Sequence, residues 1–305
     1  MFARRPAFPD GHFYSPVVDP DSISSRQDRI WPAAPTVLGI QFRAPQQRKF
    51  LTGDFRRYVR EYDYPDQPSA EAESYRFYDR NPQFSWLDSR ALFVMLRRLR
   101  PDRMIEVGSG FSSLLTADVN RRFFDGRLDF TCIEPYPPPP LQQPVPGITC
   151  LIQSKVEDVP LPEFQRLRRR DILFFDSSHV AKTGSDVNYI MFEILPRLAP
   201  GVVVHFHDIF LPNDYPKEWV LEEGRSWNEQ YVLRALLMYA DAFQVLFGSA
   251  FVFHYFPDLV AEILGGQRFG GGSLWLKTMG YGRFRARLLA FSAGVLAGYM
   301  GRRLV

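Results

Sequence analysis

The chain has 305 residues, of which 46% are hydrophobic and 15% aromatic, so it can bury a large core and a wholly disordered protein is excluded. The formal net charge is +3, but residues 263–305 carry seven Arg or Lys and no acid, which leaves residues 1–262 with a net charge of −4. Because the basic excess lies in this last segment and not across a folded domain, we expect no nucleic-acid partner.

Two cysteines, Cys132 and Cys150, stand in apolar, strand-like runs where buried thiols are common. We therefore expect neither a disulfide framework nor a cysteine-rich metal site. The first ten residues contain arginines and prolines but no apolar segment, which argues against a secretory signal and favours a cytoplasmic enzyme.

Residues 1–85 are rich in Pro, Asp, Arg and aromatic residues, and apolar positions at helical spacing predict a helix over 46–62. We interpret residues 1–85 as an N-terminal extension packed on a core. From Trp86 onward short apolar runs alternate with amphipathic segments, which predicts a doubly wound α/β domain around a mostly parallel sheet. We assign this domain to residues 86–278 and a basic, apolar tail to residues 279–305.

Seven strands are predicted within the domain, with helices between them. The strands cover residues 104–107, 130–134, 148–152, 172–176, 202–207, 242–247 and 273–277, and the clearest helices cover 89–99, 112–124, 185–198 and 228–240. Asn228 is expected to cap the last of these helices, an interpretation that we favour over a pocket formed by Trp227 and Glu229.

The first strand contains an acid and turns through two glycines into a helix, in the sequence Ile105-Glu106-Val107-Gly108-Ser109-Gly110. Side chains at Gly108 or Gly110 would block close approach of the backbone to a ligand, and parallel sheets bind nucleotides at the carboxyl ends of their strands. The second strand ends in Glu134, which supplies a carboxylate for two ribose hydroxyls. The predicted cofactor site comprises Glu106, Gly108, Ser109, Gly110, Ser112, Glu134 and Asp176.

NAD is the main competitor for such a site. Its fingerprint requires a third glycine where Ser113 stands, and it has no use for an acid at Glu106. A cofactor with a cationic amino-acid end does use such an acid, because Glu106 can face its ammonium group.

The glycine turn resembles motif I of class I S-adenosylmethionine-dependent methyltransferases, and Glu134 matches their ribose-binding acid. The resemblance covers residues 86–278. The stretches Phe175-Asp176-Ser177-Ser178-His179 and His205-Phe206-His207-Asp208 are similar to the bacterial methyltransferase-24 group. The resemblance implies a seven-stranded, Rossmann-like fold, S-adenosylmethionine as cofactor, and O-methylation of a small hydroxylated acceptor such as a sugar or a glycosylated metabolite. N-methylation on the same fold, and a non-catalytic protein that keeps the cofactor pocket, stay open as alternatives.

Methyl transfer to oxygen requires a group that removes the acceptor's proton. The resemblance to metal-dependent O-methyltransferases implies catalytic roles for His179, as the base, and for Asp208, together with a divalent cation held by Asp176, His207 and Asp208. His207 stands where an oxygen donor is usual, which suits Mg²⁺ poorly and Mn²⁺, Fe²⁺ or Zn²⁺ better. The competing interpretations are that Asp176 caps a turn and that one of His205 and His207 points into the core.

Residues 281–305 combine flanking arginines with an apolar run over 288–300 that is too short to span a bilayer as a helix. Peripheral contact with an anionic membrane surface, self-association and a disordered tail are the three expectations for this segment.

Overall fold

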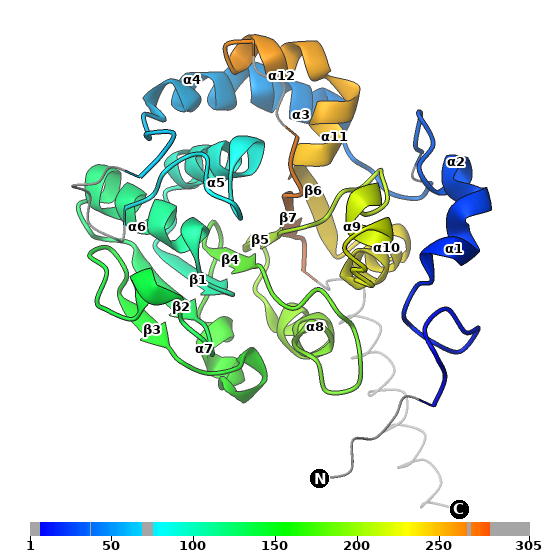
Figure 1. Cartoon of the computed structure of the whole chain (residues 1–305). Coiled ribbons are helices and arrows are strands. Elements are labelled where there is room, and N and C mark those ends of the chain that lie inside the picture. Colours follow the sequence, from blue (N-terminus) through cyan, green and yellow to red (C-terminus); the bar gives the residue numbers. More distant parts are fainter. Residues whose placement is uncertain (1–6, 37, 69–75, 267–269, 281–305) are drawn as a thin grey trace, which may run out of the picture.

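The computed structural model describes residues 7–36, 38–68, 76–266 and 270–280. Its centre is a seven-stranded sheet with the strand order β3-β2-β1-β4-β5-β7-β6 (Figure 1). Strands β1 to β5 pair in parallel, whereas β7 runs antiparallel to both β5 and β6. The strands are β1 Arg103–Val107, β2 Asp129–Ile133, β3 Cys150–Ile152, β4 Ile172–Phe175, β5 Val203–Phe206, β6 Phe243–Gly248 and β7 Leu274–Thr278. The predicted doubly wound, mostly parallel sheet is confirmed.

Every residue of β4 and β5 is buried, because helices cover both faces of the sheet. Their sequences are accordingly continuous apolar runs and do not alternate. Figure 1 shows α5 (Trp86–Leu99) and α6 (Phe111–Phe124) on one face and α7 (Leu161–Gln165) and α8 (Asp186–Tyr189) on the other.

Past α8 the helix predicted over 185–198 is broken into short pieces. A π-helical turn, η6 (Ile190–Ile194), and a 3₁₀ turn, η7 (Leu195–Arg197), follow α8 directly. Pro196 accounts for the change, since it has no N–H to continue the α-helical ladder. The remaining helices are α9 (Lys217–Leu221), α10 (Glu229–Tyr239), α11 (Ser249–Tyr255) and α12 (Pro257–Ile263).

The N-terminal region contributes to the core of the domain. The predicted helix over 46–62 forms as α3 (Ala44–Phe50), the π-helical turn η2 (Leu51–Phe55), α4 (Arg56–Tyr58) and η3 (Val59–Glu61). Phe50 and Phe55 pack against Phe247 of β6, with ring centroids 5.5 and 5.9 Å apart. Before it, α1 (Pro20–Ile23), η1 (Ser24–Arg26) and α2 (Gln27–Ile30) lead to Trp31, whose indole N–H donates to the carbonyl of Tyr215 (2.8 Å).

The two cysteines are free, and only Cys132 is buried. Cys150 was expected to be buried as well, but it lies on β3, at the edge of the sheet, and is exposed. None of the described helices is both long and apolar enough to cross a membrane. The tail at 281–305, for which membrane contact or self-association was expected, lies outside the described residues.

Candidate functional site

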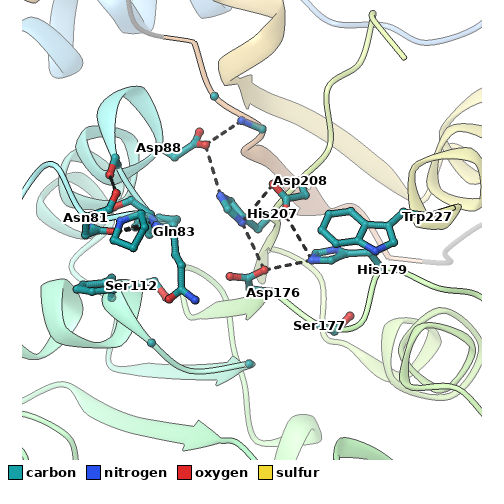
Figure 2. Close-up of a pocket in the computed structure, with 18 of the residues that line it drawn as sticks. Asn81, Gln83, Asp88, Ser112, Asp176, Ser177, His179, His207, Asp208 and Trp227 are labelled. Atoms are coloured by element: carbon teal, nitrogen blue, oxygen red, sulfur yellow. Dashed lines mark hydrogen bonds and ion pairs between the residues drawn. The ribbon is translucent and has the colours of Figure 1, made fainter. Parts of the chain in front are cut away.

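A cavity of about 820 Å³ lies at the carboxyl ends of β1, β4 and β5 (Figure 2). Because β7 is antiparallel, the glycines that precede it reach the same edge of the sheet. The cavity is lined by the glycine turn after β1, by the residues that follow β2, β4 and β5, by the loop before α5, and by residues of the segment 210–227. All the predicted site residues except Glu106 border this cavity.

The glycine turn is held in shape by its neighbours. Gly108 has φ +81°, and a Cβ at this position would lie 1.7 Å from the carbonyl oxygen of Asp176. The backbone at Asp176, directly after β4, therefore requires glycine at position 108, in addition to the close approach of a ligand that we expect there. A Cβ at Gly110 would meet only the Oε1 atom of Gln83, at 3.6 Å, so the turn faces open space at that position.

Glu106 is completely buried and does not border the cavity. Its carboxylate accepts a hydrogen bond from the hydroxyl of Ser112, at the start of α6, and the thiol of Cys132 lies 3.9 Å from its other oxygen. Burial raises the pKa of Glu106 to about 8. This placement corrects the expectation that Glu106 faces the ligand's ammonium group. The buried side chain instead binds Ser112 and so stabilises the glycine turn.

Glu134 follows β2 and borders the cavity. One of its carboxylate oxygens accepts from the backbone N–H of Ser109 (3.1 Å) and the other from that of Tyr136 (2.8 Å). These two bonds fix the carboxylate beside the glycine turn. Its remaining lone pairs can accept from a ligand's hydroxyls, as a ribose site requires.

The loop before α5 closes the other side of the cavity, and the sequence did not indicate it. The Oδ1 atom of Asn81 accepts from the backbone N–H groups of Gln83 (3.1 Å) and Phe84 (2.6 Å). Figure 2 shows the Gln83 side chain extending from this loop toward the site. An Asn followed by its own turn is a common loop signal, and nothing in the sequence tied it to the glycine turn.

Three predicted side chains meet where β4 and β5 end. Atom Nε2 of His179 lies 3.4 Å from Oδ1 of Asp176 and 3.4 Å from Oδ2 of Asp208 (Figure 2). One potential ligand atom from each of Asp176, His179 and Asp208 lies within 4.8 Å of the others, a grouping that could hold a metal ion. His179 and Asp208 both have left-handed backbone, with φ of 60° and 55°. Such strain at non-glycine residues concentrates at functional sites.

His207 adjoins this group. Its Nδ1 atom lies 3.4 Å from Oδ1 of Asp176 and 3.6 Å from Oδ1 of Asp208, and its Nε2 atom lies 3.5 Å from Oδ2 of Asp88, on α5. The group that could hold a cation therefore contains His179 where His207 was expected, and His207 lies directly beside it. His205 is the histidine that points into the core, where its ring stacks on Phe174 (3.9 Å).

The group is dominated by negative charge. Asp88, Asp176, Asp208 and Glu229 surround only two imidazoles, and all of these side chains except that of Asp176 are at most 13% exposed. Burial alone would lower the pKa of His179, but hydrogen bonds to Asp176 and Glu229 raise it to about 10. The pKa of His207 is likewise raised by Asp208 and Asp176 against the effect of burial. A bound divalent cation would balance this charge with oxygen and nitrogen donors, so the residues fit such an ion.

An aromatic wall stands next to His179 and consists of Phe210, Trp219 and Trp227, all of which border the cavity. The Trp227 ring lies 4.3 Å from that of His179, and Trp219 meets both Trp227 (5.3 Å) and Phe210 (5.2 Å). The guanidinium of Arg225 packs over Trp219 (4.0 Å) and Trp227 (4.7 Å), which stiffens the wall.

The start of α10 differs from expectation. The Asn228 side chain does not cap the helix, because its Oδ1 atom accepts from the backbone N–H of Ala181 (2.6 Å). Glu229 is buried and binds His179, and Trp227 borders the cavity. Asn228 thus holds the N-cap position as expected, but without a side-chain bond to the helix. The pocket interpretation holds for Trp227 and not for Glu229, which does not border the cavity.

The chain is similar to a protein family, to a relative from an archaeon and to several solved structures. Residues 105–209 match the methyltransferase-24 family, described as a methyltransferase domain. An uncharacterized protein of Archaeoglobus fulgidus is 36% identical over 172 residues, which span 54% of this chain and 76% of that protein. Among solved structures, the chain is similar to the S-adenosylhomocysteine-bound methyltransferase PaMTH1 of Podospora anserina (14% identity, 85% of this chain and 94% of that chain, TM-score 0.41). It is also similar to the O-methyltransferase TomG of Streptomyces achromogenes (14% identity, 75% and 90%, TM-score 0.38). The glycine turn, the acid after β2 and the family match together identify the chain as a member of the class I S-adenosylmethionine-dependent methyltransferases, within the methyltransferase-24 group.

Proposed function

We propose that this protein transfers the methyl group of S-adenosylmethionine to a hydroxyl group of a small, ring-shaped acceptor such as a sugar. One observation carries the proposal: a single cavity joins the glycine turn and Glu134 to the group of Asp176, His179 and Asp208. A cofactor bound over the turn would direct its reactive end toward these acids and the histidine, at the edge of the sheet where such folds bind nucleotides.

The proposed cofactor contacts follow from the backbone. Glu134 accepts the ribose hydroxyls with the lone pairs that Ser109 and Tyr136 leave free. Ser109 and Gly110 border the nucleotide, while Glu106 and Ser112 hold the turn beneath it. Asp176 is about one-third exposed, and its Oδ1 atom lies toward His179 and His207, which leaves Oδ2 to face the ammonium group.

In the proposed reaction the acceptor oxygen displaces the sulfur from the methyl carbon. A carbon–oxygen bond forms, the carbon–sulfur bond breaks, and the hydroxyl proton passes to Nε2 of His179, leaving a methyl ether and S-adenosylhomocysteine. Asp208, 3.4 Å from that nitrogen, stabilises the imidazolium that forms. A divalent cation held by Asp176, His207 and Asp208 would acidify a bound hydroxyl. It would also offset the negative charge that raises the pKa of His179, so that the neutral ring could take the proton on Nε2.

The aromatic wall supports a ring-shaped acceptor. Trp219 and Trp227 both border the cavity, and Trp227 adjoins His179, so a ring packed against this wall would place its own hydroxyls near the proposed base. The two aspartates could hold neighbouring hydroxyls of such a ring. The choice of a sugar as the acceptor follows the family resemblance.

The test is a screen of radioactive methyl transfer from S-adenosylmethionine to sugars, glycosylated metabolites, phenols and amines, with product analysis. We expect labelled methyl ethers, with transfer lowered about 10²-fold or more in His179→Ala, the usual contribution of a general base. Transfer only to amines would support an N-methyltransferase instead. S-Adenosylhomocysteine binding without transfer to any acceptor class would indicate a non-catalytic protein.

A further inference from the structure

Glu229 lies at the start of α10, away from the glycine turn. It contacts the Nδ1 side of the His179 ring, and Asp176 and Asp208 lie on the Nε2 side. We propose that Glu229 is a positioning residue that holds the His179 ring with Nε2 directed at Asp176 and Asp208. The inference rests on the proposed function, because it concerns the group that takes the acceptor's proton. It assigns to Glu229 a role in the reaction without contact to either substrate.

The backbone of α10 first fixes the backbone of His179. The N–H groups of Asn228 and Glu229 both donate to the carbonyl oxygen of His179, at 3.0 and 3.1 Å. The Asn228 side chain binds the backbone of Ala181, two residues further on. These bonds offset the cost of the left-handed conformation of His179, which is unfavourable for a non-glycine residue.

The Glu229 side chain then fixes the ring. Its Oε2 atom lies 2.9 Å from Nδ1 of His179. A carboxylate can only accept, so Nδ1 must carry a proton, and the neutral ring then has its lone pair on Nε2. That nitrogen faces the two aspartates, each 3.4 Å away. Either use of His179, as a base or as a ligand to a cation, requires this lone pair.

A purely structural explanation accounts poorly for a carboxylate at this position. Glu229 is 1% exposed, and its second oxygen, Oε1, has no hydrogen-bond partner among the described residues. Burying a charged group for a single bond is costly when a neutral amide could accept the same hydrogen bond. Trp227 covers the His179 ring at 4.3 Å, so the position of the ring does not depend on the charge of Glu229 alone. The negative charge itself is therefore the feature to test.

The decisive variant is Glu229→Gln in the full chain, because the amide keeps the size of the side chain but removes the charge, and its NH2 group can donate to Nδ1, so the proton is no longer held on that nitrogen. The matched control is Glu218→Gln, an exposed position on α9. We expect Glu229→Gln to lower kcat about 10- to 100-fold, as is typical of residues that orient a functional histidine, while acceptor KM and the Kd for S-adenosylhomocysteine change less than about threefold. Wild-type kcat in Glu229→Gln, with cofactor binding intact, would overturn the proposal.

A second measurement requires no acceptor and so separates this inference from the proposed function. In ¹⁵N-histidine-labelled protein, a ring N–H hydrogen bonded to a buried carboxylate gives a far-downfield proton signal, which can be assigned to His179 by its absence in His179→Gln. We expect Glu229→Gln to shift this signal upfield and Glu218→Gln to leave it in place. An unchanged signal in Glu229→Gln would overturn the positioning role, even for a protein that methylates no tested acceptor. If Glu229→Gln does not fold, Glu229→Asp provides the same comparison, with a longer and weaker bond expected.

Discussion

The Nε2 atom of His207, at the end of β5, lies 3.5 Å from Oδ2 of Asp88, at the start of α5. Asp88 also accepts from the backbone N–H groups of Gly272 (2.8 Å) and Ser273 (3.0 Å), so its carboxylate is fixed in place. With Nε2 held on this side, Nδ1 of His207 faces Asp176 and Asp208. A histidine backed by a carboxylate is a common arrangement around bound metal ions.

We therefore predict that His207→Ala weakens Mn²⁺ binding about 10-fold or more, as measured by electron paramagnetic resonance of the free ion. His254→Ala, on α11, is the matched control and should bind as the wild type does. The cation account also requires chelator to abolish methyl transfer and added Mn²⁺ to restore it. Full activity in excess chelator would remove the metal from the mechanism.

Gly108→Ala tests the contact between the glycine turn and β4. The new Cβ would lie 1.7 Å from the Asp176 carbonyl oxygen on a backbone with φ +81°. We expect a loss of more than about 3 kcal/mol in the free energy of unfolding, from backbone strain and overpacking together.

Gly126→Ala separates these two costs, because Gly126 has φ +71° and a Cβ added there would meet nothing within 4 Å. It should lose only about 1–2 kcal/mol, the cost of left-handed backbone. Equal losses in the two variants, measured by denaturant unfolding, would mean that the approach to Asp176 is not as tight as described.

Glu106 makes stability depend on pH. Its pKa is raised to about 8 in the folded protein, from an ordinary value of 4.5, so the folded state holds this proton more tightly. Its contribution to stability is complete below pH 4.5 and is lost as pH rises toward 8, with a slope of at most about 1.4 kcal/mol per pH unit. Glu106→Gln cannot titrate and should lose less stability between about pH 5 and 8 than the wild type does. Parallel stability–pH curves for the two proteins would show that Glu106 keeps an ordinary pKa.

Trp219→Ala tests the aromatic wall. Removal of the indole takes away the partner of Phe210 and Trp227 and one of the two rings under Arg225. We predict that acceptor KM rises about 10-fold, from the loss of about 1–1.5 kcal/mol of ring contact, with the Kd for S-adenosylhomocysteine unchanged. If both constants stay at wild-type values, the acceptor does not use this wall.

The sequence predicted the sheet well because each strand is a short apolar run with breaks on either side. All seven predicted strands formed, and each of their ends lies within two residues of the prediction. The helix over 185–198 was less well predicted. Its apolar residues keep helical spacing past Pro196, but this proline interrupts the helical hydrogen bonds. The packing of residues 50–55 on β6 could not be read from spacing, because it depends on contacts between segments far apart in the chain.

In the candidate site too, features set by the local sequence pattern were predicted and features set by tertiary contacts were not. The carboxyl ends of parallel strands lie at one end of the sheet, so the meeting of Asp176, His179 and Asp208 followed from their places at the ends of two predicted strands and from the family resemblance. Asp88 and Glu229 were missed as partners of the two histidines, because each lies on a helix and reaches its histidine only through tertiary packing. Glu106 was predicted to face the ligand, but it is buried. Sequence spacing locates this residue on the strand and does not show whether the glycine turn covers its side chain.

The most direct test of the account is calorimetric titration of S-adenosylhomocysteine into the wild type, Glu134→Ala and the control Asp102→Ala. Asp102 is an exposed residue at the amino end of β1, away from the carboxyl ends of the strands where the cavity lies. Glu134 is the acid that we propose to bind the ribose, so its loss should weaken binding by about 1–3 kcal/mol, the cost of leaving hydroxyls unpaired, while Asp102→Ala should bind as the wild type does. Tight binding of NAD by the wild type, with no binding of S-adenosylhomocysteine, would contradict the account.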